Sequence, residues 1–182
     1  LRALETLKSV DLIAAEDTRH TKNLLDHYEI KKPLTSFFEH NEDRKTGQLI
    51  AMLKEGKNIA LVSDAGTPGI SDPGNFLISE LVAQLGDAVE IVAVPGPSAV
   101  VAALSISGMP TDKFLFLGFP PHKKGRQTFM REVAASEYTT VFYESNHRIA
   151  KCLTELSGLL ESDRAVCVVR ELTKKFESVY RG

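Results

Sequence analysis

Residues 59–74 read Ile-Ala-Leu-Val-Ser-Asp-Ala-Gly-Thr-Pro-Gly-Ile-Ser-Asp-Pro-Gly. An apolar run leads directly to the carboxylate of Asp64, and a loop rich in glycine and proline follows. A short apolar run bounded by turn residues is typical of a buried parallel strand. Ligands of open α/β sheets bind outside the carboxyl ends of such strands. The stretch therefore predicts an α/β fold with a candidate binding loop after residue 62.

A second unit of the same kind follows in the chain. Residues 91–94, Ile-Val-Ala-Val, lead into Pro-Gly-Pro-Ser at 95–98, and an apolar helical run begins at Ala99. Glycine and proline also mark ordinary turns between strands and helices, which explains either loop by itself. Two such loops in succession, one with Asp64 at a strand end and one with Ser98 at a helix start, favour a ligand site.

The apolar periodicity along the chain predicts two α/β domains, 1–109 with a parallel sheet and 110–182 with a mixed sheet. Gly108 and Pro110 mark the boundary, because a helix ends there. We expect helices at 1–10, 18–27, 42–55, 74–85, 98–107, from 126 onward and at 146–156, with strands at 12–15, 34–38, 59–62, 89–94, 114–117, 139–143, 165–169 and 176–180. The chain begins on a helix and stops without a closing element, so both termini are predicted to be truncated.

The composition is that of a globular protein: 182 residues, 43% of them hydrophobic, with a formal net charge of −2. No apolar run approaches the roughly 20 residues that span a bilayer, which predicts a cytoplasmic protein. The first predicted domain carries 15 acidic and 10 basic residues and the second 9 and 12. The excess of bases in the second domain is consistent with either an anion-facing surface or an ordinary solvated face. Cys152 and Cys167 fit no disulfide framework, and we predict them to be reduced.

Several kinds of site are disfavoured by the absence of their motifs. Neither a dinucleotide-binding Gly-x-Gly-x-x-Gly nor a P-loop is present, nor is the Gly-x-Ser-x-Gly of a serine nucleophile. The five histidines lack metal-ligand spacing, so no metal is predicted. By contrast, Asp64 beside the permissive Gly66 suits a ligand with positive charge, such as a sulfonium or ammonium group.

Carboxylates recur at the ends of predicted strands, namely at Glu16 and Asp17, Asp64, Glu144 and Glu171. Each of them is also explained as a helix cap or a solvated turn. Their joint placement favours a site, because strand ends collect the catalytic groups of α/β proteins.

The densest basic cluster is formed by Lys123, Lys124 and Arg126, with Arg131 one to two turns further on. Phe119 and Phe129 flank this cluster. Lysine and arginine contacts to phosphates dominate the affinity of proteins for nucleic acid. The cluster is either such a surface or a solvated basic loop.

Taken together, these motifs resemble, in order and spacing over the whole chain, the ribosomal RNA small subunit methyltransferase I family of the tetrapyrrole (class III) methylase fold. The matching segments are Ala-Ala-Glu-Asp-Thr-Arg at 14–19, His-Asn-Glu at 40–42, Leu-Val-Ser-Asp-Ala-Gly-Thr-Pro at 61–68, Ser-Asp-Pro-Gly at 71–74, Pro-Gly-Pro-Ser-Ala at 95–99, Gly-Phe at 118–119, Phe-Tyr-Glu-Ser at 142–145 with His-Arg at 147–148, and Arg-Glu-Leu-Thr-Lys at 170–174. The Pro-Gly-Pro-Ser loop alone indicates only the wider superfamily.

The resemblance implies methyl transfer from S-adenosylmethionine to the 2′-hydroxyl of a cytidine in the decoding region of small-subunit (16S) ribosomal RNA. It further implies a cytoplasmic homodimer that acts on the small ribosomal subunit. The family's opening strand, with its Pro-Ile-Gly-Asn-Leu segment, is absent ahead of Leu1, and its closing strands are absent after Gly182. These differences agree with the predicted truncation.

The same resemblance implies the positions of the site residues. Those implied to bind the cofactor are Asp64, Ala65, Gly66, Ile70, Pro95, Ser98, Ala99, Phe142, Tyr143, Leu172 and Thr173. The candidates for a general base are Glu16, Asp17, His40 and Glu144, and the expected substrate contacts are Arg19, Lys123, Lys124, Arg126, Arg148 and Lys174. We expect the carboxylates of both domains to line one inter-domain cleft with Asp64. Two alternatives are a small-molecule methylase of the same fold and an inert RNA- or ribosome-binding module.

Overall fold

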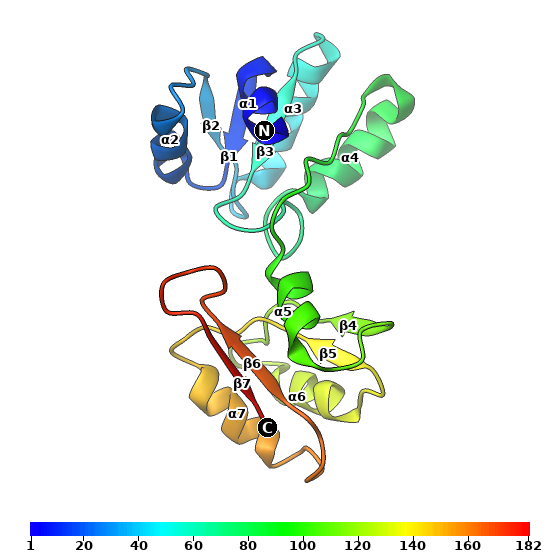
Figure 1. The fold of residues 1–182 in the computed structure, drawn as a ribbon. Coiled ribbons are helices and arrows are strands. Elements are labelled where there is room, and N and C mark those ends of the chain that lie inside the picture. The colour runs from blue at the N-terminus through cyan, green and yellow to red at the C-terminus, as the bar shows by residue number, and fades with distance from the viewer. The chain divides into compact units, whose positions relative to one another are not determined.

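The computed structural model describes residues 1–182, and its contacts divide the chain into two compact units, Leu1–Pro97 and Ser98–Gly182 (Figure 1). Sequence analysis predicted the boundary after residue 109. The difference concerns helix α5 (Ala99–Ser107), whose last carbonyl groups, those of Ile106 and Ser107, accept hydrogen bonds from the Arg181 guanidinium. Because an arginine can satisfy the free carbonyls at a helix C-terminus, this contact ties α5 to the second unit.

The first unit contains a three-stranded parallel sheet in the order β2-β1-β3. Its elements are α1 (Arg2–Ser9), β1 (Leu12–Ala15), α2 (Thr18–His27), β2 (Leu34–Ser36), α3 (Glu42–Lys54), β3 (Ile59–Val62), α4 (Asn75–Leu85) and the 3-10 turn η1 (Gly86–Ala88). The parallel sheet agrees with the prediction. Every residue of β1 is buried, as expected for a central strand covered on both faces.

Two separate hydrophobic clusters cover the faces of this sheet. Leu12 and Ala14 pack with residues of α3 and α4, whereas Ile13 packs with residues of α1 and α2. Alternate residues of a strand point to opposite faces, so β1 contributes to both clusters in turn. The sheet is thereby fixed between two layers of helices, and its carboxyl edge has a defined position.

The predicted strand over 89–94 is not formed. Val89 packs against the first cluster, but Ile91 and Val92 are exposed, and no strand is assigned in this segment. Strand β3 is an edge strand that pairs only with β1, and residues 89–94 form no ladder with its free edge. The prediction of a strand here was therefore wrong.

The second unit contains two separate two-stranded sheets instead of one mixed sheet. Strands β4 (Phe114–Phe116) and β5 (Thr139–Val141) pair in parallel, and β6 (Cys167–Arg170) and β7 (Ser178–Arg181) pair antiparallel. Helices α6 (Arg126–Ala135) and α7 (Ile149–Ser157) pack together through a cluster of Phe129, Met130, Val133, Cys152 and Leu156. No helix of the protein combines the length and apolar character that a bilayer crossing requires.

Candidate functional site

The carboxylates after β1 and β3 lie next to each other, because these strands are parallel neighbours that end in register at Ala15 and Val62. The backbone N–H of Asp64 donates to Oε2 of Glu16 at 3.2 Å, and the backbone N–H of Asp17 donates to Oδ1 of Asp64 at 3.3 Å. These reciprocal contacts join the two strand-end loops. The structure thus brings together three of the predicted acidic residues in the first unit.

Asp17 has a second role as the cap of α2. Its Oδ1 accepts from the backbone N–H of Arg19 at 2.8 Å, and the Arg19 guanidinium contacts both carboxylate oxygens at 3.1 and 2.7 Å. This hydrogen bonding with Arg19 holds the pKa of Asp17 well below its usual range. Both oxygens of Asp17 are therefore occupied, and the exposed Arg19 is already paired within its own helix turn.

Asp72 is a member of the acidic group that the sequence did not single out. Partial burial, together with the nearby charges of Glu16 and Asp64, raises the pKa of the Asp72 carboxyl, while a hydrogen bond with Ser63 opposes that change. Sequence analysis did recognise the Ser-Asp-Pro-Gly segment at 71–74, which contains Asp72. The spacing of its residues did not show that the segment folds back toward the ends of β1 and β3. The strand-end loops therefore carry a concentrated negative charge.

We expect Asp72→Asn to raise the stability of the protein at pH 7, by less than about 1 kcal/mol because the group is partly solvated. A carboxyl with a raised folded-state pKa binds its proton more tightly in the folded state, so its contribution to stability falls as pH rises above the unfolded pKa of about 4. The advantage of the variant should disappear at about pH 4. Thermal unfolding of both proteins at the two pH values measures this, and a variant less stable at pH 7 would show that the Ser63 contact outweighs the repulsion.

Glycine allows the loop after β3 to turn and to pack closely. Gly66 has a φ of +78°, and a Cβ there would meet no atom within 4 Å, so the backbone at this point is open to a ligand. Gly74 has a φ of +132°, and its Cβ would lie 2.7 Å from Cδ2 of Leu61. Its N–H donates to Oε1 of Glu42 at 3.0 Å. Ala65 and Ile70 of the same loop are exposed.

The other residues predicted to bind the cofactor, to act as a base or to contact the substrate lie on different elements of the two units. Pro95 is exposed in the first unit, whereas Ser98 is the N-cap of α5 and Ala99 its first residue. In the loop after β6, Leu172 is half-buried, and Thr173 has a positive φ of +66°. His40 is exposed, with its ring edge-on to Phe38. Lys174 is exposed.

Aromatic side chains surround the end of β5. The ring of Tyr143 lies 5.3 Å from that of Phe116 and 5.2 Å from that of Phe119, while the ring of Phe142 lies edge-on to Phe129 at 5.5 Å. The Tyr143 N–H donates to the carbonyl oxygen of Gly118 at 2.7 Å, which continues the pairing of β4 and β5. Phe119 is exposed, so this cluster presents an aromatic face of the kind that adenine rings contact.

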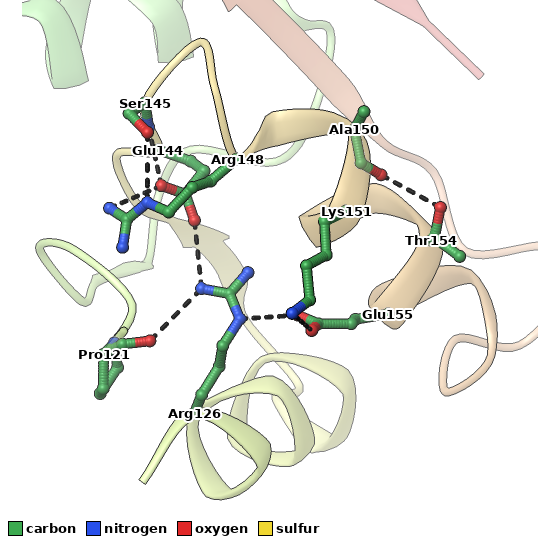
Figure 2. Close-up of polar contacts among 9 residues, drawn as sticks. All are labelled: Pro121, Arg126, Glu144, Ser145, Arg148, Ala150, Lys151, Thr154 and Glu155. Atoms are coloured by element: carbon green, nitrogen blue, oxygen red, sulfur yellow. Dashed lines mark hydrogen bonds and ion pairs between the residues drawn. The ribbon is translucent and has the colours of Figure 1, made fainter. Parts of the chain in front are cut away.

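Glu144 follows this cluster and is the centre of a buried ion network, shown in Figure 2. Its side chain is only 1% exposed. Oε1 accepts from Arg148 at 2.7 Å and from the Ser145 N–H at 2.7 Å, and Oε2 accepts from Arg126 at 3.2 Å. Both oxygens thus contact guanidinium groups, so each oxygen is engaged in an ion pair. The arrangement is that of a structural anion.

Arg126 differs from its predicted role as a surface phosphate contact. Its side chain is 9% exposed and donates to Glu144, to Oε2 of Glu155 at 2.7 Å and to the carbonyl oxygen of Pro121 at 3.3 Å. This guanidinium is paired with two carboxylates and is therefore not a free surface cation. Lys123 and Lys124 are exposed, and their role as substrate contacts stays a prediction.

Comparison with known proteins identifies relatives along the whole chain. The family described as Tetrapyrrole (Corrin/Porphyrin) Methylases matches residues 1–182. A ribosomal RNA small subunit methyltransferase I from Synechocystis sp. is 50% identical over the full chain, which spans 64% of that relative. The protein of the same name from Thermotoga maritima is 44% identical, and the chain spans 80% of it. This chain therefore spans less than two thirds of the Synechocystis relative.

A solved structure shares the fold. The X-ray structure of a cobalamin biosynthetic enzyme, cobalt precorrin-4 methyltransferase, aligns with a TM-score of 0.66 over 100% of this chain and 77% of its own. The two sequences are 18% identical. At this level the likeness concerns the fold alone, and the predicted α/β tetrapyrrole methylase fold is confirmed.

Proposed function

The chain belongs to the ribosomal RNA small subunit methyltransferase I family of the tetrapyrrole methylases, and from this membership we propose that it serves S-adenosylmethionine-dependent 2′-O-methylation of a cytidine in small-subunit (16S) ribosomal RNA. The single observation that carries the proposal is the 44–50% identity to relatives of that name over the full length of this chain. We further propose that the enzyme is a cytoplasmic homodimer and acts on the small ribosomal subunit.

The acidic loops of the first unit fit the charge of S-adenosylmethionine. Glu16, Asp64 and Asp72 gather there, and partial burial, together with the charges of Glu16 and Asp64, raises the pKa of Asp72. A sulfonium or ammonium group near them would offset this repulsion. S-adenosylmethionine supplies the methyl group when bound. We propose that Asp64 and the open backbone around Gly66 hold its cationic part.

The remaining proposed cofactor contacts are those that suit adenosine. The exposed aromatic face at Phe119 and Tyr143 offers a stacking surface. Residues proposed to complete the cofactor contacts are Ala65, Ile70, Pro95, Ser98, Ala99, Phe142, Leu172 and Thr173. Because this assignment rests on the family resemblance, each position remains a proposal.

A ribose hydroxyl is a weak nucleophile near pH 7, so orientation and a general base would both contribute to the rate. Asp17 and Glu144 already hold guanidinium groups through both of their oxygens. Glu16 accepts only one hydrogen bond, from the Asp64 N–H, and His40 is exposed. We propose Glu16 and His40 as the stronger candidates for the base. That Glu16, Asp64 and Glu144 line one cleft stays a prediction.

Two measurements on the full-length protein test the proposal. Calorimetry should detect S-adenosylmethionine binding, and radiolabelled methyl groups should appear in small ribosomal subunits as 2′-O-methylcytidine after nuclease digestion. Absence of cofactor binding would leave an inert RNA-binding module as the explanation. Binding of the cofactor with methylation of a tetrapyrrole instead of RNA would support the small-molecule alternative.

A further inference from the structure

A pocket lies between helices α6 and α7, and none of its lining residues is among those proposed to bind the cofactor. Its volume is about 520 Å³. The loop before α6, both buried and exposed residues of α6, and residues of α7 with the turn that follows it form its walls. The residues used in the argument below are His122, Lys123, Arg126, Arg131, Lys151 and Glu155.

The pocket carries an excess of positive charge. Lys123 and Arg131 are exposed and form no ion pair, and Lys151 is 75% exposed and reaches Glu155 only at 3.8 Å. Glu155 is the one acidic residue of the lining, and its Oε2 is already engaged by Arg126 at 2.7 Å. Three cations from the loop, α6 and α7 therefore surround one hollow whose single carboxylate is shared between Arg126 and Lys151.

The buried network beneath the pocket holds its walls together. Arg126 begins α6 and pairs with Glu155 of α7 and with Glu144 after β5, as Figure 2 shows. The charge of Arg126 is compensated by these two carboxylates. Arg126 therefore holds the pocket walls in place and does not itself attract an anion. Arg131 and Lys151 then lie on two helices, α6 and α7, that the Arg126–Glu155 contact joins. Because the helices are already held together, no helix has to be repositioned when the cationic side chains bind an anion.

We propose that this α6–α7 pocket binds a phosphodiester group of the RNA substrate, with Arg131 and Lys151 as opposing contacts and Lys123 at its edge. The proposal rests on the proposed function, because it takes RNA as the anion. Arginine offers a planar set of donors that fits phosphate oxygens, and lysine adds a mobile point charge. His122 adds a possible hydrogen-bond donor at the same edge.

The test is the salt dependence of RNA binding by the full-length protein. The Kd for small-subunit ribosomal RNA is measured over a series of KCl concentrations for the wild type and for an Arg131→Gln, Lys151→Gln double variant. Loss of the one neutralised phosphate should lower the magnitude of the slope of log K against log salt by about 1 in the double variant. S-adenosylmethionine affinity and the melting temperature should remain those of the wild type.

The matched control removes the same charge elsewhere. Lys54 and Lys57 are exposed, form no ion pair and lie in the first unit, so Lys54→Gln, Lys57→Gln should keep the wild-type slope. A double pocket variant with the slope of this control would overturn the proposal. If the wild type binds RNA but transfers no methyl group, the proposed function fails. The salt slopes of the wild type and the variants then still show whether the pocket binds a phosphodiester group. If the wild type binds no RNA, both proposals fail.

Discussion

Glu144→Gln should lower the free energy of unfolding by about 3–5 kcal/mol, the range for removing one partner from a buried ion pair. The substitution keeps the shape of the side chain but removes the charge that faces Arg126 and Arg148. The NH2 group of the new amide also replaces an acceptor oxygen beside a guanidinium. Two hydrogen-bond donors then face each other and cannot form a hydrogen bond. Urea unfolding of the full-length variant and wild type, analysed with a common slope, measures the difference.

Glu155→Gln is the matched control, because Glu155 pairs with the same Arg126 but has a side chain that is 31% exposed. Water can replace part of its contact, so its loss of stability should be clearly smaller than that of Glu144→Gln. The measurements then distinguish a structural role of Glu144 from a role as general base. A variant with wild-type stability and methyl transfer slowed by about 10²-fold or more would identify Glu144 as a general base after all.

The carboxyl edge of the first sheet could be predicted from sequence because it depends on local features. An acidic residue follows each of the apolar runs at 12–15 and 59–62 within two positions, and parallel pairing places such ends side by side. The cap at Asp17 and the helix end at Gly56, whose φ is +81°, follow from the same short-range chemistry. Once β1 and β3 are known to be parallel neighbours, the proximity of Glu16 and Asp64 follows without further knowledge of tertiary packing.

The features that sequence analysis missed depend on contacts between distant segments. Arg126 looks like a member of a surface basic cluster until Glu144 and Glu155, 18 and 29 residues away, are seen to enclose it. Similarly, the run at 89–94 has the apolar composition of a strand, but pairing requires a neighbour that composition does not reveal. Asp72 lay within a recognised segment, yet its proximity to Glu16 depends on how the loop folds.

Asp64→Ala should weaken S-adenosylmethionine binding by roughly 1–3 kcal/mol, which is about 5- to 150-fold in Kd, if this carboxylate is the charged partner of the cofactor. Asp64 is exposed at the end of β3, and one of its oxygens already accepts from the Asp17 N–H. Asp64→Asn retains an acceptor for that bond but removes the charge. We therefore expect the asparagine variant to lose most of the same affinity in calorimetry.

Asp11→Ala provides the control for the effect of the strand-to-strand contact itself. Asp11 precedes β1 at the opposite edge of the sheet, where its Oδ2 accepts from the Asn58 N–H at 2.8 Å, and so it joins the amino ends of β1 and β3 much as Asp64 joins their carboxyl ends. Its removal should reduce stability and leave cofactor affinity unchanged. Equal Kd values for Asp64→Ala and the wild type would exclude Asp64 from the cofactor site, whereas a loss shared by Asp11→Ala would assign the effect to the sheet and not to the charge.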